Sequence, residues 1–368
     1  MDADRQFMQR ALQLARQGEG LVEPNPMVGS VIVRNGTVLG EGFHTKFGGP
    51  HAEIEAIRSA GSATVGATCY VTLEPCSHHG KTPPCTDAVL AAGFKRLVVA
   101  MRDPHPSVNG RGLQVLRGSG LEITEGVLEA EARHLNAPYL TRLEKSRPWI
   151  IAKWAMTLDG RLASRTGSSQ WISCDASREL VHRLRSRMDA IMIGSQTALR
   201  DNPLLTVRLP NVTRQLLRIV FDSQAQTPLS GQLVRTMKEA PVLIVVGSEA
   251  PQQRVAELER AGCEILHVSA PTYRERLLFL FENLVRRGVT NLLIEGGAGL
   301  FGGLFDLQLI DEVHTFIAPK LIGGDAAVGV VGGVGLIDMP SGATIDAPEI
   351  RIVDGDVYLH GRVRYPER

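Results

Sequence analysis

Cysteine is scarce in this sequence, and an excess of charge of one sign is missing. Five cysteines occur among 368 residues, an odd number at sparse spacing, which excludes a disulfide framework and indicates a reducing compartment. Forty Lys and Arg face 39 Asp and Glu, which leaves a formal net charge of +1. This balance argues against a strongly basic nucleic-acid-binding surface, although a local patch can hide within a neutral total.

Long apolar runs are absent as well. No uninterrupted stretch approaches the ~20 residues that are needed to span a bilayer. Residues 1–17 begin acidic and follow an amphipathic helical pattern, and they lack the basic start and apolar middle of a signal peptide. We therefore expect a cytoplasmic protein with neither a membrane nor a nucleic acid as partner.

What is present is the ordinary composition of a packed protein, in a chain longer than one domain. Hydrophobic residues make up 43% and charged residues 21%. Since a typical domain has roughly 100–200 residues, two domains are expected. The polar stretch 142–147 is the best linker candidate, because Pro148 discourages continuation of the preceding helix. The expected domains are therefore residues 1–147 and 148–368.

Both halves alternate helical and strand patterns. The first half runs from an opening helix through the apolar strand 28–33 to one closing helix over residues 128–146. In the second half, β-branched runs such as 217–223 and 240–248 alternate with helical segments such as 274–288. Such interleaving predicts two α/β domains with largely parallel sheets.

The first half contains residues of metal-binding type in a specific order. An H-A-E run is followed by P-C and then by a second cysteine. Zinc favours thiolate and imidazole ligands, and a catalytic zinc keeps one position open for water. We expect His51, Cys76 and Cys85 to bind zinc and Glu53 to handle protons. This is the layout of a zinc nucleobase deaminase, in which activated water attacks an amino-bearing ring carbon.

Other interpretations of this region stay open. The residues could form a non-catalytic zinc knot, or the cysteines could simply be buried. Most deaminases of this class place two residues between the cysteines, whereas SHHGKTPP separates them here. His78 and His79 in that insert could compete as ligands, contact substrate or be solvated.

A family resemblance is carried by TLEPCSHHGKTPPC, with PNPMVG and HAE before it and DPHPSVNGRG after it. These segments resemble the deaminase half of the bifunctional deaminase–reductase family of riboflavin biosynthesis. The resemblance implies a three-layer, cytidine-deaminase-like fold that deaminates 2,5-diamino-6-ribosylamino-4(3H)-pyrimidinone 5′-phosphate. It also implies zinc as the metal and substrate contacts at Asn25, His44, Lys81 and Thr82. An amide can both donate to and accept from a ring edge, and a lysine can meet a phosphate. The alternatives are a turn role for Asn25 and a solvated Lys81.

The second half has a glycine-rich turn, IEGGAGLFGG, between a predicted strand and a predicted helix. Backbone N–H groups at a helix N-terminus suit phosphate, but the run is not GxGxxG and is a weak signal by itself. Cys174 and Cys263 have no nearby partner and are expected to be inert packing residues.

The segments KWAMTLDGRLA, SSQWIS, RSRMDAIMIGSQTALRDNPLLTVR and IEGGAGLFGGL occur in the order of the family's reductase domain, which resembles dihydrofolate reductase. The resemblance implies NADPH as hydride donor and reduction of the ribosyl group to ribityl, giving 5-amino-6-(5-phosphoribitylamino)uracil. The implied NADP contacts are Ala155, Trp171, Thr197, Asp201, Ser223, Gly297, Ala298, Gly299, Leu300, Phe301, Gly302 and Gly303. The implied substrate contacts are Ser169, Arg185, Leu205, Arg208 and Glu295.

Elementary chemistry supports some of these residues. Arg185 and Arg208 can form paired hydrogen bonds to a phosphate, although Arg185 lies on a basic helix face that could simply be solvated. Trp171 either stacks on a cofactor ring or fills the core. Glu295 ends a strand, which is where open α/β sheets bind ligands.

Two alternatives to this two-site enzyme remain. One is an RNA- or DNA-editing deaminase with an accessory domain, against which the neutral charge and the long cysteine gap count. The other keeps the deaminase and makes the second half a binding or assembly domain. We expect small phosphorylated pyrimidines as partners and a homo-oligomer, either a dimer or a tetramer.

Overall fold

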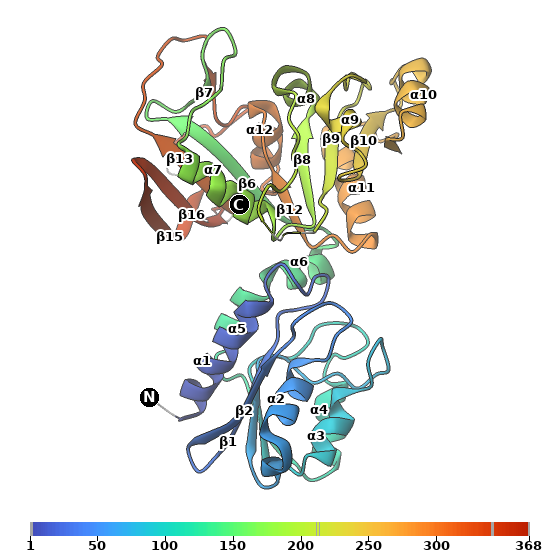
Figure 1. The fold of residues 1–368 in the computed structure, drawn as a ribbon, viewed down its shortest axis with the longest axis vertical. Helices are drawn as coiled ribbons and strands as arrows, with labels where there is room; N and C mark the ends of the chain where they lie inside the picture. Colours follow the sequence, from blue (N-terminus) through green and yellow to red (C-terminus); the bar gives the residue numbers. More distant parts are fainter. Residues whose placement is uncertain (1–2, 211, 213, 340–341, 367–368) are drawn as a thin grey trace. The chain divides into compact units, whose positions relative to one another are not determined.

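The chain forms two compact units in a computed structural model that describes residues 3–210, 212, 214–339 and 342–366. The units are Met1–Ser146 and Arg147–Arg368 (Figure 1). This division assigns Arg147 to the second unit, whereas the boundary expected from the sequence keeps it in the first. Arg147 forms a double ion pair with Asp311, with Nη2 2.7 Å from Oδ1. In the described part of the chain, no helix is long and apolar enough to cross a membrane.

The first unit has a five-stranded sheet in the order β2-β1-β3-β4-β5. Strand β1 runs antiparallel to both of its neighbours, and β3, β4 and β5 run parallel to one another. The strands are β1 (Gly29–Arg34), β2 (Thr37–Phe43), β3 (Thr68–Val71), β4 (Arg96–Val99) and β5 (Glu122–Glu125). The helices are α1 (Ala3–Ala15), η1 (Arg16–Gly18), α2 (Ala52–Ala60), η2 (Gly61–Thr64), α3 (Cys85–Ala91), α4 (Arg111–Gly118), α5 (Glu129–Leu135) and α6 (Ala137–Lys145).

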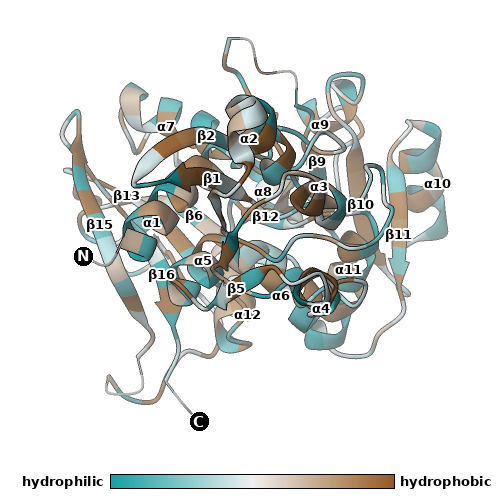
Figure 2. Cartoon of the chain, turned by 90° about the horizontal axis from the view of Figure 1, so that it is seen from below, coloured by the Kyte–Doolittle hydropathy of each residue, from teal (hydrophilic) through white to brown (hydrophobic). Residues whose placement is uncertain are grey.

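Helices cover both faces of this sheet, which gives the expected three layers. Because successive strand residues point to opposite faces, β1 supplies two cores. Val31 packs with Met8 of α1 in one core, and Ile32 packs with Ala56 of α2 and Leu113 of α4 in the other. Figure 2 shows the apolar residues of these strands in brown.

The expected closing helix over residues 128–146 is wrong in one respect, because it is two helices. Asn136 separates α5 from α6 and pairs with the backbone of Met27, accepting its N–H at 2.8 Å and donating to its carbonyl at 2.9 Å. Pro138 at the start of α6 also has no N–H to continue the preceding helix. The break ties the segment after α1 to the end of the unit.

The second unit has a nine-stranded sheet in the order β11-β10-β9-β8-β12-β6-β13-β16-β15. From β11 to β13 all neighbours run parallel, and β16 and β15 add an antiparallel edge. The nine strands are β6 (Trp149–Thr157), β8 (Ala190–Gly194), β9 (Leu217–Phe221), β10 (Val242–Gly247), β11 (Glu264–Val268), β12 (Asn291–Ile294), β13 (Glu312–Ala318), β15 (Thr344–Val353) and β16 (Asp356–Arg364). A small second sheet pairs β7 (Arg161–Ala163) with β14 (Val328–Gly329).

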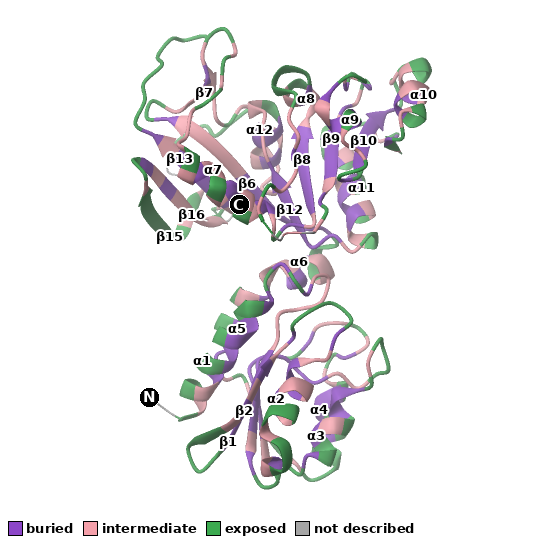
Figure 3. Cartoon of the chain, in the orientation of Figure 1, coloured by how far each residue is buried: buried purple, intermediate pink, exposed green. Residues whose placement is uncertain are grey.

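Helices and apolar strands form the core of this unit. Leu277 and Phe281 of α11 pack with Ile150 of β6 and Leu292 of β12, all of them buried. The central strands appear purple, for buried, in Figure 3. The helices are α7 (Asp175–Arg185), α8 (Ser195–Asp201), α9 (Gln232–Arg235), α10 (Gln252–Arg260), α11 (Tyr273–Arg286) and α12 (Ala298–Asp306).

Candidate active sites

The three expected zinc ligands converge at the ends of two helices. His51 immediately precedes α2, Cys85 is the first residue of α3, and Cys76 lies in the loop that follows β3. His51 Nδ1 lies 3.1 Å from the Cys85 sulfur and 3.6 Å from the Cys76 sulfur. All three donor atoms lie within 4.8 Å of one another. Two sulfurs and one imidazole nitrogen at this separation are a donor set that fits a tetrahedral zinc with one open position.

Close packing of α2 against the sheet positions His51. A Cβ atom on Gly40 or Gly42 of β2 would lie 2.5 or 2.4 Å from backbone atoms of Ala56 in α2. Only glycine therefore lets this helix approach the strand so closely.

The pKa values of the two thiols are shifted in opposite directions. The hydrogen bond from Cys85 lowers the pKa of Cys76 to about 4, against the effect of burial and with help from His51. The same hydrogen bond and burial raise the pKa of Cys85. A coordinated zinc ion deprotonates a thiol outright, so both sulfurs are suited to bind the metal as thiolates.

Glu53 lies two residues after His51, next to the cluster of expected zinc ligands. It is the second residue of α2 and is 3% exposed. Burial raises the pKa of its carboxyl group, and the neighbouring His51 opposes that shift. Burial thus favours the protonated form of this carboxyl group, which suits a residue that must take up and release a proton as a general acid–base group.

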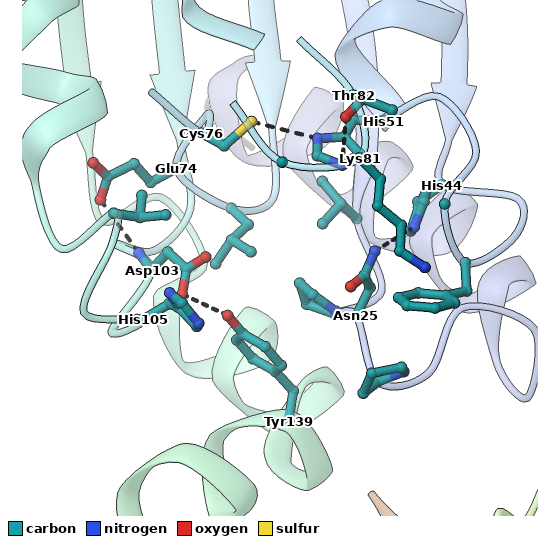
Figure 4. Close-up of a pocket in the computed structure, with 18 of the residues that line it drawn as sticks. Asn25, His44, His51, Glu74, Cys76, Lys81, Thr82, Asp103, His105 and Tyr139 are labelled. Carbon is teal, nitrogen blue, oxygen red and sulfur yellow. Dashed lines mark hydrogen bonds between the residues drawn. The ribbon is translucent and has the colours of Figure 1, made fainter. Parts of the chain in front are cut away.

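A cavity of about 260 Å³ opens beside the cluster, and Glu53 is among the residues that line it. The four weaker predicted substrate residues, Asn25, His44, Lys81 and Thr82, also line the cavity (Figure 4). Asn25 Nδ2 lies 3.1 Å from His44 Nε2, and Thr82 Oγ1 lies 3.5 Å from His51 Nε2. The Lys81 ammonium group lies 3.9 Å from the ring centre of Phe47.

The two histidines of the cysteine insert do not join the cluster of donor atoms that the described residues form. His78 is exposed, lines the cavity and stacks on His105 with ring centres 6.4 Å apart. His79 is exposed and does not line the cavity.

Sequence reasoning missed the opposite wall of this cavity. Asp103 Oδ1 accepts the hydroxyl of Tyr139 at 2.8 Å, and burial raises the pKa of Asp103. Buried Glu74 holds the following loop by accepting backbone N–H groups from Asp103, Gly110, Gly112 and Leu113. The run DPHPSVNG pointed to this segment, but no spacing rule singled out Asp103 within it.

The second unit has a cavity of about 900 Å³ that gathers most of its predicted site residues. Gly296 and Gly297 adopt φ values of 128° and 82°, and a Cβ on Gly296 would lie 3.0 Å from Thr197. Gly296, Gly297, Ala298 and Gly299 line the cavity, so the start of α12 borders it, as a phosphate cradle requires. The predicted residues that line the cavity are Ala155, Ser169, Trp171, Arg185, Thr197, Asp201, Leu205, Arg208, Glu295, Gly297, Ala298, Gly299, Leu300 and Phe301.

Three predicted cofactor contacts are not on the wall of this cavity. Ser223 accepts a hydrogen bond from Arg276 at 3.4 Å. Gly302 and Gly303 lie further along α12, where added Cβ atoms would meet the backbone of Gly332 and the ring of Tyr273 at 2.2 and 2.4 Å. Close helix packing accounts for both glycines.

A buried ion network occupies the floor of the second cavity. Glu295 accepts two hydrogen bonds from Arg185, at 2.7 and 2.8 Å, and lies 3.0 Å from the Lys153 ammonium group. Burial would raise the pKa of Glu295, but the two cations outweigh it and hold that pKa well below its usual range. Lys153 was missed by sequence reasoning, and a lysine within an otherwise apolar strand was the available signal.

The two arginines of the second cavity, Arg185 and Arg208, differ in the hydrogen bonds that they make within the protein. Arg185 also donates to the carbonyl of Thr206 at 3.1 Å, so three of its five N–H groups are used. Arg208 donates its backbone N–H to His182 Nδ1 at 3.3 Å. Burial and the two arginines lower the pKa of His182 to about 4, so this part of the cavity is electropositive.

Trp171 does not fill the core, because it is 63% exposed. The Arg178 guanidinium lies 4.5 Å from its ring centre, and Lys320 donates to its carbonyl at 2.7 Å. Trp171 lines the cavity, and with Arg178 against one face of its ring the other face is the one that can stack on a ligand.

Comparisons with known proteins match both halves. Residues 1–101 match the cytidine and deoxycytidylate deaminase zinc-binding region, and residues 148–355 match the RibD C-terminal domain. The chain is 40% identical to riboflavin biosynthesis protein RibD of Actinobacillus pleuropneumoniae, over 97% of this chain and 94% of that one. It is 39% identical to RibD of Escherichia coli K12, over 97% and 98% of the two chains.

Solved structures agree with these matches. RibD of Acinetobacter baumannii, form 1, superposes with a TM-score of 0.86 at 34% identity, covering 98% of this chain and 99% of that one. A diaminohydroxyphosphoribosylaminopyrimidine deaminase/5-amino-6-(5-phosphoribosylamino)uracil reductase of Thermotoga maritima gives 0.83 at 35% identity, with the same coverage.

The folds, the zinc-type cluster and the second cavity define a bifunctional deaminase–reductase. The expected fold classes are confirmed by the matches to both halves. The chain belongs to the RibD family of riboflavin biosynthesis proteins. It is an enzyme with a zinc-binding deaminase domain and an NADPH-dependent reductase domain. Membership in this family decides against the nucleic-acid-editing and binding-domain alternatives.

Proposed function

We propose that the chain deaminates 2,5-diamino-6-ribosylamino-4(3H)-pyrimidinone 5′-phosphate and then reduces the ribosyl group of the product to ribityl. The reaction product is 5-amino-6-(5-phosphoribitylamino)uracil. The observation that carries the first step is the His51–Cys76–Cys85 cluster beside buried Glu53 at the wall of a cavity. The Thermotoga maritima relative is named for these two activities, and this chain covers 99% of it.

In the first reaction, His51, Cys76 and Cys85 hold the zinc ion. Bound zinc supplies a Lewis acid that lowers the pKa of a water molecule. With zinc held by these residues, Glu53 would take a proton from the attacking water and deliver it to the departing amine. Its burial supports this role, because a carboxyl group with a raised pKa binds and releases protons readily.

Substrate positioning in the first site falls to the cavity wall. Asn25 is held by His44 and presents its amide to the ring edge. Lys81 meets the phosphate, and Thr82 lies next to the ligand His51. The exposed position of Lys81 over Phe47 suits a group that must reach the solvent-side end of a phosphorylated ligand.

In the second reaction, NADPH supplies the hydride, and the protein supplies orientation and charge. The glycine turn and the first N–H groups of α12 receive a phosphate of the cofactor. The exposed ring of Trp171 stacks on a cofactor ring. Ala155, Thr197, Asp201 and Ser223 complete the proposed cofactor contacts, and Gly302 and Gly303 support the helix that carries the turn.

The substrate of the second reaction lies against Ser169, Leu205, Arg208 and Glu295. Arg208 grips the phosphate, because Arg185 is already held by Glu295 and by the carbonyl of Thr206. Arg185 therefore acts mainly by fixing the carboxylate of Glu295. His182 adds no charge near neutral pH, since its pKa is about 4.

We also propose that residues 1–147 and 148–368 are the respective catalytic domains and that the enzyme is cytoplasmic and homo-oligomeric. Light scattering on the purified chain distinguishes a dimer or tetramer from a monomer.

The experiment that tests the ligand assignment is Cys76→Ser, with Cys174→Ser as the matched control. Cys174 caps helix α7 through its side chain, a role that serine fills well. Cys76→Ser loses zinc and ammonia release together while NADPH oxidation with the deaminated intermediate persists. Cys174→Ser keeps all three. Full zinc occupancy in Cys76→Ser would remove Cys76 from the ligand set.

A further inference from the structure

A second group of metal-ligating side chains lies on the antiparallel edge of the nine-stranded sheet. Glu312 and His314 are two residues apart on β13 and therefore share a face. His360 of β16 is directly opposite His314, and Glu349 of β15 is directly opposite His360. Strand pairing thus places His314, His360 and Glu349 in one row across three strands, which lie side by side in Figure 1, and Glu312 joins this row as the neighbour of His314 on β13.

The donor atoms of this row face one another. A carboxylate oxygen of Glu312, an imidazole nitrogen of His314 and one of His360 all lie within 4.8 Å of each other. Glu312 Oε1 is 2.9 Å from His314 Nε2, and His360 Nε2 is 3.1 Å from Glu349 Oε2. Neighbouring ligands of a tetrahedral zinc lie about 3.3 Å apart when metal–ligand bonds are about 2.0–2.1 Å. The donor atoms therefore have separations close to those of one metal site. The imidazole rings of His314 and His360 are stacked with centres 5.1 Å apart, so at least one ring must turn for both to bind the same ion.

Outer hydrogen bonds orient the two innermost side chains. The Tyr358 hydroxyl lies 2.6 Å from His314 Nδ1, on the opposite side of the ring from Glu312. When His314 carries its proton on Nδ1 and donates it to Tyr358, the Nε2 lone pair faces the row. Trp149 Nε1 donates to Glu312 Oε2 at 3.1 Å, which leaves Oε1 directed at His314. Such outer partners are the usual means by which proteins fix the ligands of a metal.

The row is reachable from solvent, and two carboxylates and two arginines lie on its face of the sheet. The side chains of His314, Glu312 and His360 are 8%, 25% and 23% exposed, and that of Glu349 is 70% exposed. Glu312 and Glu349 supply the two carboxylates. Arg362 is directly opposite Glu312 on β16, and the guanidinium groups of Arg351 and Arg362 lie 5.0 Å from the ring centres of Tyr358 and Trp149. A bound cation therefore shares the carboxylates with these arginines, and the donor atoms rather than the net charge define the site.

We propose that Glu312, His314 and His360, with Glu349 at the rim, form a second metal site for a divalent first-row transition ion such as zinc. Imidazole and carboxylate donors suit such ions, and the absence of sulfur in this row distinguishes it from the thiolate site of the deaminase. A bound ion links β13, β16 and β15. It thereby holds the antiparallel edge of the sheet together.

Cobalt titration of the full-length, tag-free, metal-stripped chain tests the proposal. Two equivalents of Co²⁺ bind. One develops a thiolate-to-cobalt charge-transfer band, from His51, Cys76 and Cys85. The other produces only the visible bands of cobalt with nitrogen and oxygen ligands. Binding of a single equivalent, with the charge-transfer band, overturns the proposal without recourse to any variant.

Variants assign the second equivalent. Cys76→Ser removes the charge-transfer band, so the remaining binding reports on the new site alone. In that background, His360→Gln and Glu349→Gln each weaken the sulfur-free equivalent at least tenfold, whereas the control His267→Gln on β11 does not. Zinc also raises the Tm of Cys76→Ser and fails to raise that of Cys76→Ser/His360→Gln. Unchanged cobalt affinity in both row variants, or an equal Tm shift with and without His360, contradicts the assignment.

Discussion

Glu53 combines deep burial, a raised pKa and a position beside the metal-type cluster, and its carboxyl group is the only one that we assign to proton transfer in the first reaction. Glu53→Gln keeps the shape of the side chain and removes its ability to carry a proton. Since general acid–base catalysis contributes about 10²–10⁴-fold, ammonia release falls by about that factor while zinc content and NADPH oxidation are retained. Metal analysis and an ammonia assay on the same preparation measure both.

Two outcomes contradict this role of Glu53. A loss of activity below roughly tenfold would mean that another group moves the proton. A fall in zinc content parallel to the activity would mean that Glu53 only fixes His51 in place.

Individual site residues differed in how far the sequence revealed them. His51, Glu53, Cys76 and Cys85 lie within 35 positions of one another, and the chemical identity of the side chains points to their grouping. Arg185 and Glu295 form an ion pair although they are 110 positions apart. The sequence around either residue does not indicate which residue it pairs with. The phosphate role expected for Arg185 stays a prediction, and the structure adds that three of its five N–H groups already pair within the protein.

At the scale of elements, the turn between β6 and β7 is clamped to a distant loop by Asp159. Its Oδ1 accepts the hydroxyl of Thr157 at 2.5 Å, and its Oδ2 accepts the backbone N–H of Gly323 at 2.7 Å. The hydrogen bond from Thr157, followed by that from Gly323, lowers the pKa of Asp159 to about 2. Its carboxylate form is therefore the one that the folded state favours.

Asp159→Asn tests this clamp through the pH dependence of stability. A carboxyl group whose pKa is lower in the folded state stabilises the protein above its unfolded pKa of about 4 and loses that effect as the pH falls toward about 2. The parent chain therefore has the higher Tm at pH 6, and the difference from Asp159→Asn narrows between pH 4 and pH 3. Thermal unfolding of both chains over this range measures it, and a Tm difference that stays constant with pH would contradict the clamp.

Elements with uniform local patterns were predictable, and those shaped by distant contacts were not. The parallel strands β9 and β10 are apolar apart from Arg218 in β9, and they were expected where they occur. Strand β15 contains Pro348 and many charges, and it is mostly exposed (green in Figure 3). A proline is tolerated in an edge strand or a bulge, and the register of β15 shifts between Asp346 and Glu349 to accommodate it. The helix break at Asn136 likewise depends on Met27, more than a hundred residues away.

At the scale of the whole molecule, the residue at which the two units are separated determines how stable the second unit is as an isolated fragment. Arg147 pairs with Asp311, and both side chains are 9% exposed. Asp311 also accepts the backbone N–H of Ile150 at 2.8 Å. Without Arg147, the buried carboxylate of Asp311 loses its paired cation. Breaking a buried ion pair in this way lowers the free energy of unfolding by about 3–5 kcal/mol.

A fragment of residues 147–368 is therefore more stable than one of residues 148–368, and both retain NADPH oxidation where they fold. Urea unfolding of the two fragments gives the difference directly. Asp311→Asn in the longer fragment is the control, because it removes the charge that Arg147 satisfies. Equal unfolding midpoints for the two fragments would show that the ion pair does not support the second unit.

The order of the two reactions is the central claim about the molecule as a whole, and the Glu53→Gln chain allows it to be measured. Deamination by this variant is expected to be about 10²–10⁴-fold slower, so each pyrimidine reaches the reductase before it is deaminated. A site whose hydrogen-bonding groups match the deaminated ring rejects the amino precursor strongly, because the mismatch leaves buried groups unpaired. The phosphate grip of Arg208 is common to both compounds and does not discriminate between them. We predict that NADPH oxidation by Glu53→Gln has the parental kcat/KM with the deaminated intermediate and a far lower one with the diamino precursor. Equal kcat/KM for the two compounds would contradict the claim that the second site imposes the order.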